Sequence, residues 1–432
     1  MGGFAKRMSM AMSDRGTVNS PRLLLLVAII GGGVALRTAD MSDVVTRTPD
    51  ERVYTHYAVA VVDGGLPAVR RVFADYLRDP SSWIYPGPTR LTHVFLFAAM
   101  MRITDLRDSR AGAMVSWAAS VGSLVLTAWI GYRFFNPWVG LIGATFMASC
   151  FGELGCVRRA WGDSTASCLS LALMLIALEI RRTPKRTWLY ALLFGVGAAA
   201  LLNKETAILA YALCGFWLSS VMAVEKRSWP LFGRVAAAGI ASILAAIIIW
   251  YVLAGGGAIA WKSFHQVNSS GLGSDAWGQE YASGPWFQFI YFLWLVGPVT
   301  LVMALLGVSI VASSDSWLRE TLGISDRGGL SLAIFVTLTF IGVAAFGPNL
   351  QYLRVMAPAN GAYCLLAGLG VWLILVLARR SMPDAYHPIL TLCVAVALAP
   401  STVADYRRFN EVVVQTDMQD MSVKDVRDVL ER

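Results

Sequence analysis

The chain has 432 residues, of which 56% are hydrophobic and only 15% are charged. Soluble domains are nearer half apolar and one quarter charged, so this composition excludes an ordinary soluble protein of this size. The net charge of +8 would suggest a nucleic-acid partner if the protein were soluble. Here the basic residues gather in short segments between apolar runs, as they do in the cytoplasmic loops of membrane proteins, so no nucleic-acid partner is expected.

Long apolar runs recur from Leu23 to Val403, and most are about 15–25 residues long, which suits membrane-spanning helices. Only α-helices and closed β-barrels satisfy their own backbone polar groups inside a bilayer. The runs are rich in Ala, Leu, Val and Gly and do not alternate with period two, unlike barrel strands. The sequence therefore predicts an all-α, polytopic transmembrane bundle of about eleven spans.

The first apolar run, 23–36, follows a basic tail and has no convincing small-residue cleavage site before Arg37. It is predicted to remain as the first helix, with the N-terminus in the cytoplasm. The strongest basic loop, Arg181 to Arg186, is placed in the cytoplasm for the same reason. Counting helices back from that loop works only if the short run 91–101 does not cross the membrane. Residues 37–110 are then one long external loop with interfacial helices.

The same counting assigns the rest of the chain to the two sides of the membrane. A second external loop is predicted at 254–285, and residues 1–404 form one transmembrane domain. Residues 405–432 form a short external polar tail, which either packs on the surface or begins a domain that the chain lacks. After 23–36, the expected spans are 111–131, 138–155, 165–180, 188–203, 206–223, 231–253, 286–312, 330–346, 356–378 and 387–403.

Six cysteines lie in or beside apolar runs without the spacing of metal ligands, and the four histidines are scattered. Cysteines in such positions are small packing residues, so neither a disulfide framework nor a histidine metal cage is predicted. A divalent cation would instead use carboxylates, and Asp50 and Asp163 are the candidates for it.

Several charged residues fall on the predicted external side, at the ends of short helices. Charges in apolar surroundings are costly and usually mark a site. Their occurrence on one side of the membrane therefore predicts a polar cavity there. The residues are Asp50, Glu51, Arg158, Arg159, Asp163, Lys204, Glu205 and Arg354.

Asp50 and Glu51 are adjacent carboxylates that follow Pro49. Such a pair can supply a general base or metal ligands when it is partly buried. Alternatively, the two acids cap the helix that begins after Pro49, where negative charge is favourable at the helix N-terminus. The residues alone leave both interpretations open.

The basic residues of this group also have two interpretations. Lys204 and Arg354 can bind an anionic group, or they can extend from helix ends toward water. Arg158 and Arg159 are either part of the same anion site or anchors at the membrane interface. Asp163 either binds a metal or pairs with one of those two arginines, and pairing is favoured.

Six short motifs occur in order along the chain. Their order and their common side resemble the GT-C glycosyltransferases, in particular the protein O-mannosyltransferases and aminoarabinose transferases (glycosyltransferase family 39 and relatives). The resemblance covers roughly residues 20–380. The motifs are Pro49-Asp50-Glu51 with Tyr54, Tyr85-Pro86-Gly87-Pro88, Arg158-Arg159 with Asp163, Leu202-Asn203-Lys204, Gly297-Pro298 within 291–307, and Gln351-Tyr352-Leu353-Arg354 with Pro358.

The resemblance implies an enzyme of the plasma (inner) membrane with its active site on the external side. It would transfer a sugar from a polyprenyl-phosphate-linked donor to an acceptor hydroxyl, with inversion at the anomeric carbon. The acceptor would be a protein, a lipid or a glycan. Asp50 would take the proton of the acceptor, and Glu51 would orient Asp50 or the acceptor.

The donor phosphate is expected on fixed cations, which stabilise the charge that develops on the leaving group. Lys204 and Arg354 are the leading candidates, followed by Arg158 and Arg159. Supporting roles are expected for Asp163, Tyr352, Tyr85 and His265.

Two of these supporting residues, Tyr85 and His265, either depart from the family pattern or have a second interpretation. Relatives often carry His or Lys where this chain has Tyr85, so its phosphate contact departs from the family pattern. His265 lies in the second external loop, whose Gly and Ser residues predict a mobile lid. A lone histidine in a loop either contacts substrate or is merely exposed.

Two other functions compete with the enzyme. Charges within membranes also mark the path of a transporter or lipid flippase, although this chain shows no repeat relating its two halves and no matching pair of broken helices. A non-catalytic relative that binds lipid or a partner would retain the fold and tolerate the loss of Asp50.

Overall fold

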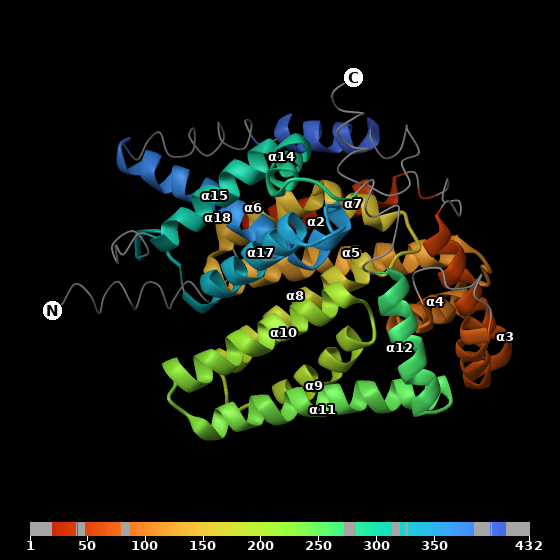
Figure 1. Ribbon diagram of the computed structural model, residues 1–432. Coiled ribbons are helices and arrows are strands. Elements are labelled where there is room, and N and C mark those ends of the chain that lie inside the picture. Colours follow the sequence, from red (N-terminus) through yellow and green to blue (C-terminus); the bar gives the residue numbers. More distant parts are fainter. Residues whose placement is uncertain are drawn as a thin grey trace.

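The computed structural model describes residues 20–39, 48–78, 87–271, 282–312, 320–324, 327–383 and 400–411, together with residues 41 and 398. Within these residues the regular structure is helical and contains no β-strand, so the predicted all-α fold is confirmed. The longer helices lie side by side in one elongated bundle (Figure 1).

The helices of the first half of the chain are α2 (Ser20–Thr38), α3 (Pro49–Arg78), α4 (Leu91–Thr104), α5 (Ser109–Ile130), α6 (Pro137–Ala148), α7 (Phe151–Val157), α8 (Asp163–Arg182), α9 (Thr187–Leu201) and α10 (Glu205–Ser220). Those of the second half are α11 (Trp229–Ala254), α12 (Gly257–Gly271), α14 (Trp286–Val296), α15 (Pro298–Ala312), α17 (Arg327–Phe346) and α18 (Asn360–Arg380). Short π-helical turns extend α5 and α10, and a 3₁₀ helix, η5 (Leu353–Ala359), leads into α18.

Six helices among the described residues are long and apolar enough to cross a membrane alone, and eight spans result if each of two bent helix pairs counts as one. The polytopic character is therefore confirmed, whereas the count of about eleven is not. Three predicted spans lie outside this count. The span 23–36 corresponds to α2, and the span 188–203 corresponds to the 15-residue α9. Of the third, 387–403, only residues 398 and 400–403 are described.

Two predicted spans, 138–155 and 286–312, are bent helix pairs and not continuous helices as expected. α6 and α7 meet at 54°, and α14 and α15 meet at 114°. At the second bend Pro298 begins α15, and because proline has no N–H to donate, α14 cannot continue through it. At the first bend the guanidinium of Arg37 donates to the carbonyls of Met147 and Ala148, at 2.9 and 3.0 Å, which satisfies the end of α6.

Helix α18 forms the centre of the bundle, between α6 and α15. Glycines allow this close approach: a Cβ added at Gly368 would lie 2.7 Å from the backbone nitrogen of Gly143, and one at Gly370 would lie 2.0 Å from the carbonyl oxygen of Met303. Small residues at such crossings let membrane helices gain van der Waals contact. The charged motif that precedes α18 is thereby anchored to the most buried of the candidate membrane spans.

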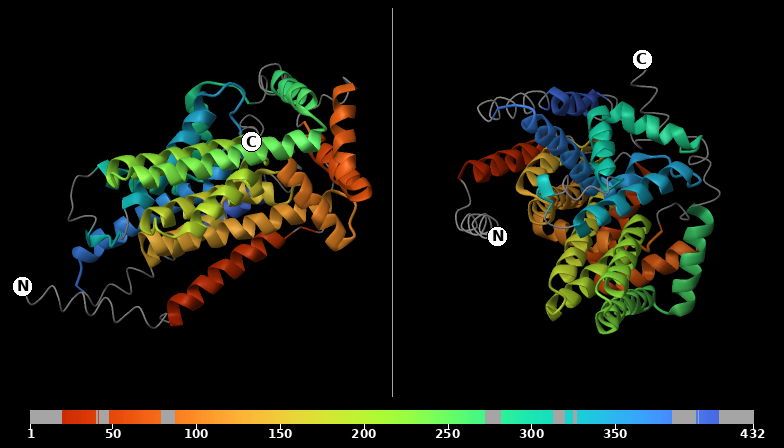
Figure 2. Two further views of the ribbon diagram at one scale, coloured as in Figure 1. Left: turned by 90° about the horizontal axis from the view of Figure 1, so that it is seen from below. Right: turned by 90° about the vertical axis from the view of Figure 1, so that its left-hand side faces the viewer.

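Helix α11 lies at the outside of the bundle, next to α9 and α10 (Figures 1 and 2). Only 17% of the most apolar 18-residue stretch of α11 is buried inside the protein. Large apolar side chains on this helix are more than half exposed: Ile247 and Tyr251 each by 53%, and Ile248 by 59%. An apolar face of this kind requires a hydrocarbon environment, so α11 faces lipid.

Helices α3, α4 and α12 lie together at one end of the bundle (Figure 1). α3 bends at Gly65, whose φ of 61° favours glycine, and its buried side chains pack against α4. At 14 residues, α4 is a short apolar helix outside the set of spans, in line with its predicted interfacial position.

Within the second predicted external loop, 254–285, residues 257–271 form the helix α12. The chain turns into this helix at Gly255 and Gly256, with φ values of 88° and 139°. Phe264 then packs against Trp250 of α11, with the ring centroids 5.7 Å apart, which fixes the helix on the bundle. Of the Gly- and Ser-rich stretch 268–274 that suggested a mobile lid, residues 268–271 end α12, and residues 272–274 lie outside the described residues.

The predicted boundary at residue 404 falls within a helical segment, 400–409. Asp405 and Phe409 of this segment are buried, and the ring of Phe409 meets that of Phe151 edge-on at 6.1 Å. The segment therefore packs on the bundle beside α7.

Candidate functional site

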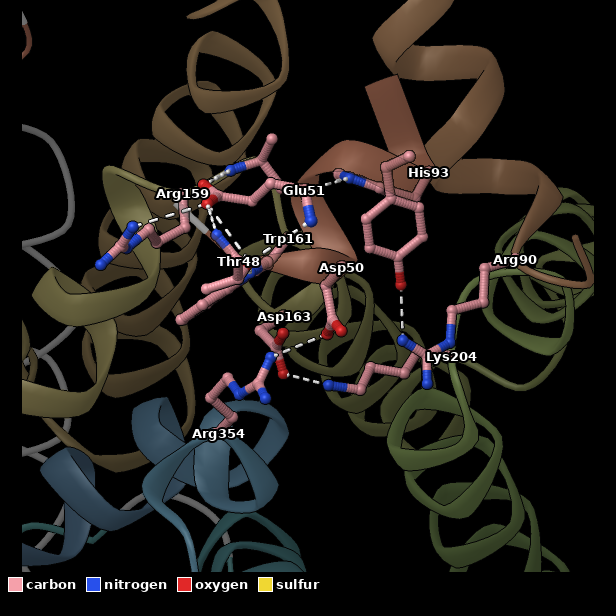
Figure 3. A network of polar contacts seen from close by, with 12 residues as sticks. Thr48, Asp50, Glu51, Arg90, His93, Arg159, Trp161, Asp163, Lys204 and Arg354 are labelled. Atoms are coloured by element: carbon pink, nitrogen blue, oxygen red, sulfur yellow. Dashed lines mark hydrogen bonds and ion pairs between the residues drawn. The ribbon is translucent and has the colours of Figure 1, made fainter. Parts of the chain in front are cut away.

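A cluster of charged side chains lies at the end of the bundle that carries α3, α4 and α12 (Figure 3). Its members come from the first turn of α3, the turn before α4, the α7–α8 and α9–α10 connections, and η5. All of these are helix termini, where the chain can place a polar side chain without interrupting an apolar span. The sequence prediction of one polar site formed by distant helix ends thus corresponds to a real cluster.

Asp50 and Arg354 are joined although they lie 304 residues apart, with Nη1 of Arg354 donating to Oδ2 of Asp50 at 3.2 Å. Arg354 also lies over the ring of Trp161, 4.3 Å from its centroid, and 5.4 Å from that of Tyr352. These cation–π contacts hold the guanidinium in place. The side chain of Asp50 remains 19% exposed, so its carboxylate is accessible from outside.

Glu51 differs from Asp50 because its side chain is fully buried. Its carboxylate accepts from the backbone N–H of Thr48 at 3.0 Å, and the N–H of Glu51 contacts the Thr48 hydroxyl at 3.3 Å, which forms a capping box at the start of α3. The other carboxylate oxygen, Oε1, accepts from the N–H of Ala160 at 3.2 Å, while Arg159 donates to Oε2 at 3.5 Å. Glu51 thus fits the capping interpretation of the sequence and ties α3 to the α7–α8 connection.

Asp163 pairs with Lys204, with a distance of 2.5 Å between the ammonium and the carboxylate. The sequence favoured pairing for Asp163, but with Arg158 or Arg159, and the structure supplies a different partner. Both side chains are nearly inaccessible, at 2% for Asp163 and 6% for Lys204. Burial lowers the pKa of Lys204, and the carboxylate of Asp163 opposes that shift.

Arg90 is a member of the cluster that the sequence prediction missed. Its guanidinium is buried and donates to Glu205 at 2.7 Å and to the hydroxyl of Tyr54 at 2.5 Å. Glu205 was noted as a charged residue of this side but not as a site residue, and it keeps 41% of its side chain exposed. The available signal was an arginine directly before the short apolar run 91–101, which resembles an ordinary interfacial anchor.

His93 is a second residue that the prediction of the site did not include. It is fully buried, packs edge-on against Tyr54 at 4.9 Å, and its Nε2 lies 3.2 Å from the carbonyl of Ala160. Burial lowers its pKa to about 4, so the imidazole is neutral at physiological pH. His93 therefore supports the packing of α4 beneath the cluster.

Of the remaining predicted residues, Tyr352 adjoins the cluster, Arg158 and His265 lie at the end of α7 and on α12, and Tyr85 is not described. Tyr352 lies beside Arg354, and burial raises its pKa to about 12. Arg158 is half-buried at the end of α7, whereas His265 lies on α12 and faces a different cavity from that of the cluster. Tyr85 lies outside the described residues.

A cavity of about 190 Å³ opens beside the cluster, between α10 and α11; we call it the α10–α11 groove. Most of its wall is apolar, and its polar end is formed by Arg90, Lys204 and Glu205. The apolar lining residues are Leu201, Leu202, Ile208, Ile243, Ala246, Ile247, Trp250 and Phe264. An apolar channel whose polar end holds two cations and one carboxylate suits an amphipathic anion that competes with that carboxylate for Arg90.

Asp50 and Asp163 were the candidate ligands for a divalent cation. Each carboxylate instead accepts from a basic side chain, Arg354 or Lys204. Among the described residues, no three His, Cys, Asp or Glu side chains converge as metal ligands do. The cluster as it stands is a set of paired charges.

No family model and no curated protein matches the sequence. Among solved structures, the apo oligosaccharyltransferase of Archaeoglobus fulgidus matches 91% of this chain with 12% identity and a TM-score of 0.60. The same organism's AglB, in complex with an inhibitory peptide and a dolichol-phosphate, matches 90% with 10% identity and a TM-score of 0.57. ArnT from Cupriavidus metallidurans, bound to undecaprenyl phosphate, matches 96% with 15% identity and a TM-score of 0.55.

These similarities show the fold, which is that of the GT-C glycosyltransferases, and the predicted resemblance is confirmed at this level. The chain spans 56% of the length of each archaeal oligosaccharyltransferase and 74% of that of ArnT. The spatial arrangement of the helices is thus shared, although the sequences are only 10–15% identical.

Proposed function

We propose that this protein transfers a sugar from a polyprenyl-phosphate-linked donor to an acceptor hydroxyl on the external face of the membrane, with inversion. The observation that carries the proposal is the α10–α11 groove, whose apolar walls lead from the lipid-facing side of α11 to Lys204 and Arg90. The accessible carboxylate of Asp50 belongs to the same charged cluster (Figure 3). One site thus offers places for a lipid chain, a phosphate and a general base.

The donor's lipid chain fits the groove because α11 exposes its apolar face to the bilayer and Ile243 and Ile247 line the groove. The phosphate would lie at Lys204 and Arg90, with Arg354 next to them; Arg90 is added here to the cations that the sequence suggested. Two proteins with this fold support the choice of ligand, since ArnT was solved with undecaprenyl phosphate and AglB with a dolichol-phosphate.

In the proposed reaction the acceptor oxygen attacks the anomeric carbon of the sugar from the face opposite the phosphate. The hydroxyl proton passes to Asp50, the new C–O bond forms, and the bond between the anomeric carbon and the phosphate oxygen breaks. The electron pair of that bond remains on the phosphate, where Lys204 and Arg90 stabilise the additional charge. The released product is polyprenyl phosphate, and a single displacement inverts the anomeric configuration.

Asp50 is preferred to Glu51 as the base because only Asp50 is accessible, whereas Glu51 is fully buried in its capping box. We assign Glu51 a positioning role: it fixes the first turn of α3, and thereby Asp50, to the α7–α8 connection.

The external location is supported by the distribution of charge along the spanning helices. α8 begins at Asp163, and α18 follows η5, which carries Arg354; the two helices end in basic pairs, Arg181-Arg182 and Arg379-Arg380. α10 begins at Glu205 and leads to Lys226-Arg227. Because such loops are retained in the cytoplasm, the cluster lies on the opposite, external side.

The test uses purified protein in lipid, a panel of polyprenyl-phosphate sugars, and release of polyprenyl phosphate as the readout. Wild type should consume one donor, and Asp50→Asn should lose at least about a hundredfold in rate, the usual contribution of a general base. Asp63→Asn is the matched control, since Asp63 lies on the same helix with 61% of its side chain exposed.

Two results would contradict the proposal. Equal release by wild type and Asp50→Asn would exclude Asp50 as the base. A wild type that neither binds nor consumes any polyprenyl-phosphate donor, in the presence of protein, lipid and glycan acceptors, would favour the transporter or flippase.

A further inference from the structure

A second cavity, of about 570 Å³, lies between the C-terminal half of α3 and α12, and we call it the α3–α12 cavity. Its apolar floor is formed by Ala74, Leu77 and Ile259. Its polar lining residues are Arg78, Lys262, His265 and Gln266. No carboxylate is among them, although the exposed carboxylate of Asp75, one turn before Arg78 on α3, lies 4.0 Å from the Arg78 guanidinium. Two permanent cations, an imidazole and an amide thus surround a hollow that no part of the proposed reaction uses.

The position of this cavity is fixed at the end of the lipid-facing helix α11. Arg70 of α3 donates to the carbonyl of Val252 in the last turn of α11, at 3.3 Å, and its side chain covers Gly255. The chain then turns through Gly255 and Gly256 into α12. The α3–α12 cavity therefore lies where the apolar surface of α11 ends, which is the level of the lipid headgroups.

The exposed side chains of α12 have the composition of a membrane interface. Trp261 and Phe264 stack with their centroids 6.1 Å apart and are 63% and 44% exposed. Trp261 also meets the ring of His265 at 4.9 Å. Aromatic rings concentrate at this depth in membrane proteins, and basic residues there attract anionic headgroups.

We propose that the α3–α12 cavity binds the phosphate headgroup of an anionic phospholipid of the surrounding bilayer, with Arg78 and Lys262 contacting the phosphate and Trp261 lying against the acyl chains. Charge complementarity defines the ligand as an anion, and the phosphate ester of a lipid headgroup is the anion that a bilayer offers at this level. The adjoining lipid-facing surface of α11 and the exposed aromatic residues identify the bilayer as its source.

A lipid in this cavity would act on the α10–α11 groove, because α12 is a wall of both. Phe264 lines the groove, whereas Lys262 and His265, from the same turn of the helix, line the α3–α12 cavity. A headgroup held between Arg78 and Lys262 would join α3 to α12 and keep Phe264 at the groove. This consequence rests on the proposed function, whereas the binding of the lipid does not.

The test measures binding to the purified full chain in detergent by native mass spectrometry, with three probes: short-chain phosphatidylglycerol, short-chain phosphatidylcholine and glycerol phosphate. Wild type should bind phosphatidylglycerol more tightly than phosphatidylcholine and should not retain glycerol phosphate. The double variant Arg78→Gln/Lys262→Gln should bind phosphatidylglycerol about tenfold or more weakly, since each interfacial cation contributes to headgroup affinity. Arg102→Gln, an exposed cation of α4 outside the cavity, is the control and should bind as wild type does.

Equal phosphatidylglycerol affinity for wild type and the double variant would overturn the site. Retention of glycerol phosphate as tightly as of phosphatidylglycerol would overturn the bilayer as the source, because a water-soluble phosphate ester would then suffice. Arg78 and Lys262 are both exposed, so the double variant should fold, which an unchanged melting temperature without lipid would verify. Since the readout is binding, its failure is distinguishable from a failure of the transferase proposal.

Discussion

Variants of the ion pair between Asp163 and Lys204 can distinguish an effect on the free energy of unfolding from an effect on the affinity for the donor. The two groups are 2.5 Å apart, and at most 6% of either side chain is exposed. Removing one partner of a buried ion pair leaves an uncompensated charge and typically costs 3–5 kcal/mol. Replacing both partners by neutral residues of similar volume is often nearly neutral. We therefore expect the two single variants and the double variant to behave very differently.

Lys204→Met should lower the free energy of unfolding by about 3 kcal/mol, the lower end of that range, because Arg354 also acts on the charge of Asp163. Asp163→Asn should cost a similar amount, since it leaves Lys204 buried among Arg90 and Arg354. The double variant should return to within about 1 kcal/mol of wild type. Unlike its stability, its affinity for the donor should not recover, because the proposed phosphate site has lost a cation.

The assays are equilibrium unfolding in mixed micelles and binding of a polyprenyl-phosphate donor by the same preparations. If the double variant loses as much stability as the two single variants together, the charges of Asp163 and Lys204 are not coupled, and burial does not determine their cost. If the double variant binds donor as wild type does, Lys204 does not contact the phosphate.

Three further predictions concern other parts of the molecule. Glu205→Gln should bind the donor about fivefold more tightly, because a carboxylate that is 41% exposed, in a pair worth about 1 kcal/mol, no longer competes for Arg90; donor titration measures this. His93→Gln should reduce the loss of stability on acidification. In wild type the pKa of His93 is about 4 in the folded protein and 6.5 in the unfolded chain, so the unfolded chain takes up the proton first and wild type loses up to about 3 kcal/mol as the pH falls from 6.5 to 4. Unfolding measured across that pH range tests this. Gly370→Ala should destabilise the bundle by about 1–3 kcal/mol because its Cβ would overlap a backbone oxygen of α15, whereas Gly342→Ala, with open space around it, should have little effect in the same unfolding assay.

Each of these has a result that would contradict it. Unchanged donor affinity in Glu205→Gln would show that the carboxylate does not compete with phosphate. Equal acid sensitivity of wild type and His93→Gln would show that another group carries the proton uptake. Equal stability of the two glycine variants would mean that α15 and α18 adjust without cost.

The fold class and most spans were predictable from the sequence, because both depend on local properties. An apolar run of sufficient length must form a helix in a bilayer whatever its neighbours are, so helices such as α8, α11 and α17 follow from composition and length. The bends are less accessible to such reasoning. Gly297-Pro298 was visible as a motif, yet its 114° angle depends on how α14 and α15 pack on the bundle.

The residue types of the site were also predictable, because charged groups at the ends of apolar helices are costly and therefore conspicuous. Asp50, Lys204 and Arg354 were selected on that ground, and all three belong to the cluster. α12 was not predicted, because its many small and polar residues are typical of a loop. The contact of Phe264 with Trp250 of α11, which holds the helix on the bundle, is visible only in the structure.

Only the tertiary structure decided which charges meet. Partners such as Asp50 and Arg354 are 304 residues apart, and no local pattern encodes that distance. The same holds for the contrast between two adjacent acids: Glu51 is buried by contacts with Ala160, while Asp50 remains accessible. Sequence determines the cost of placing a charge at a helix end, whereas packing determines the partner that offsets this cost, because the partner comes from another helix.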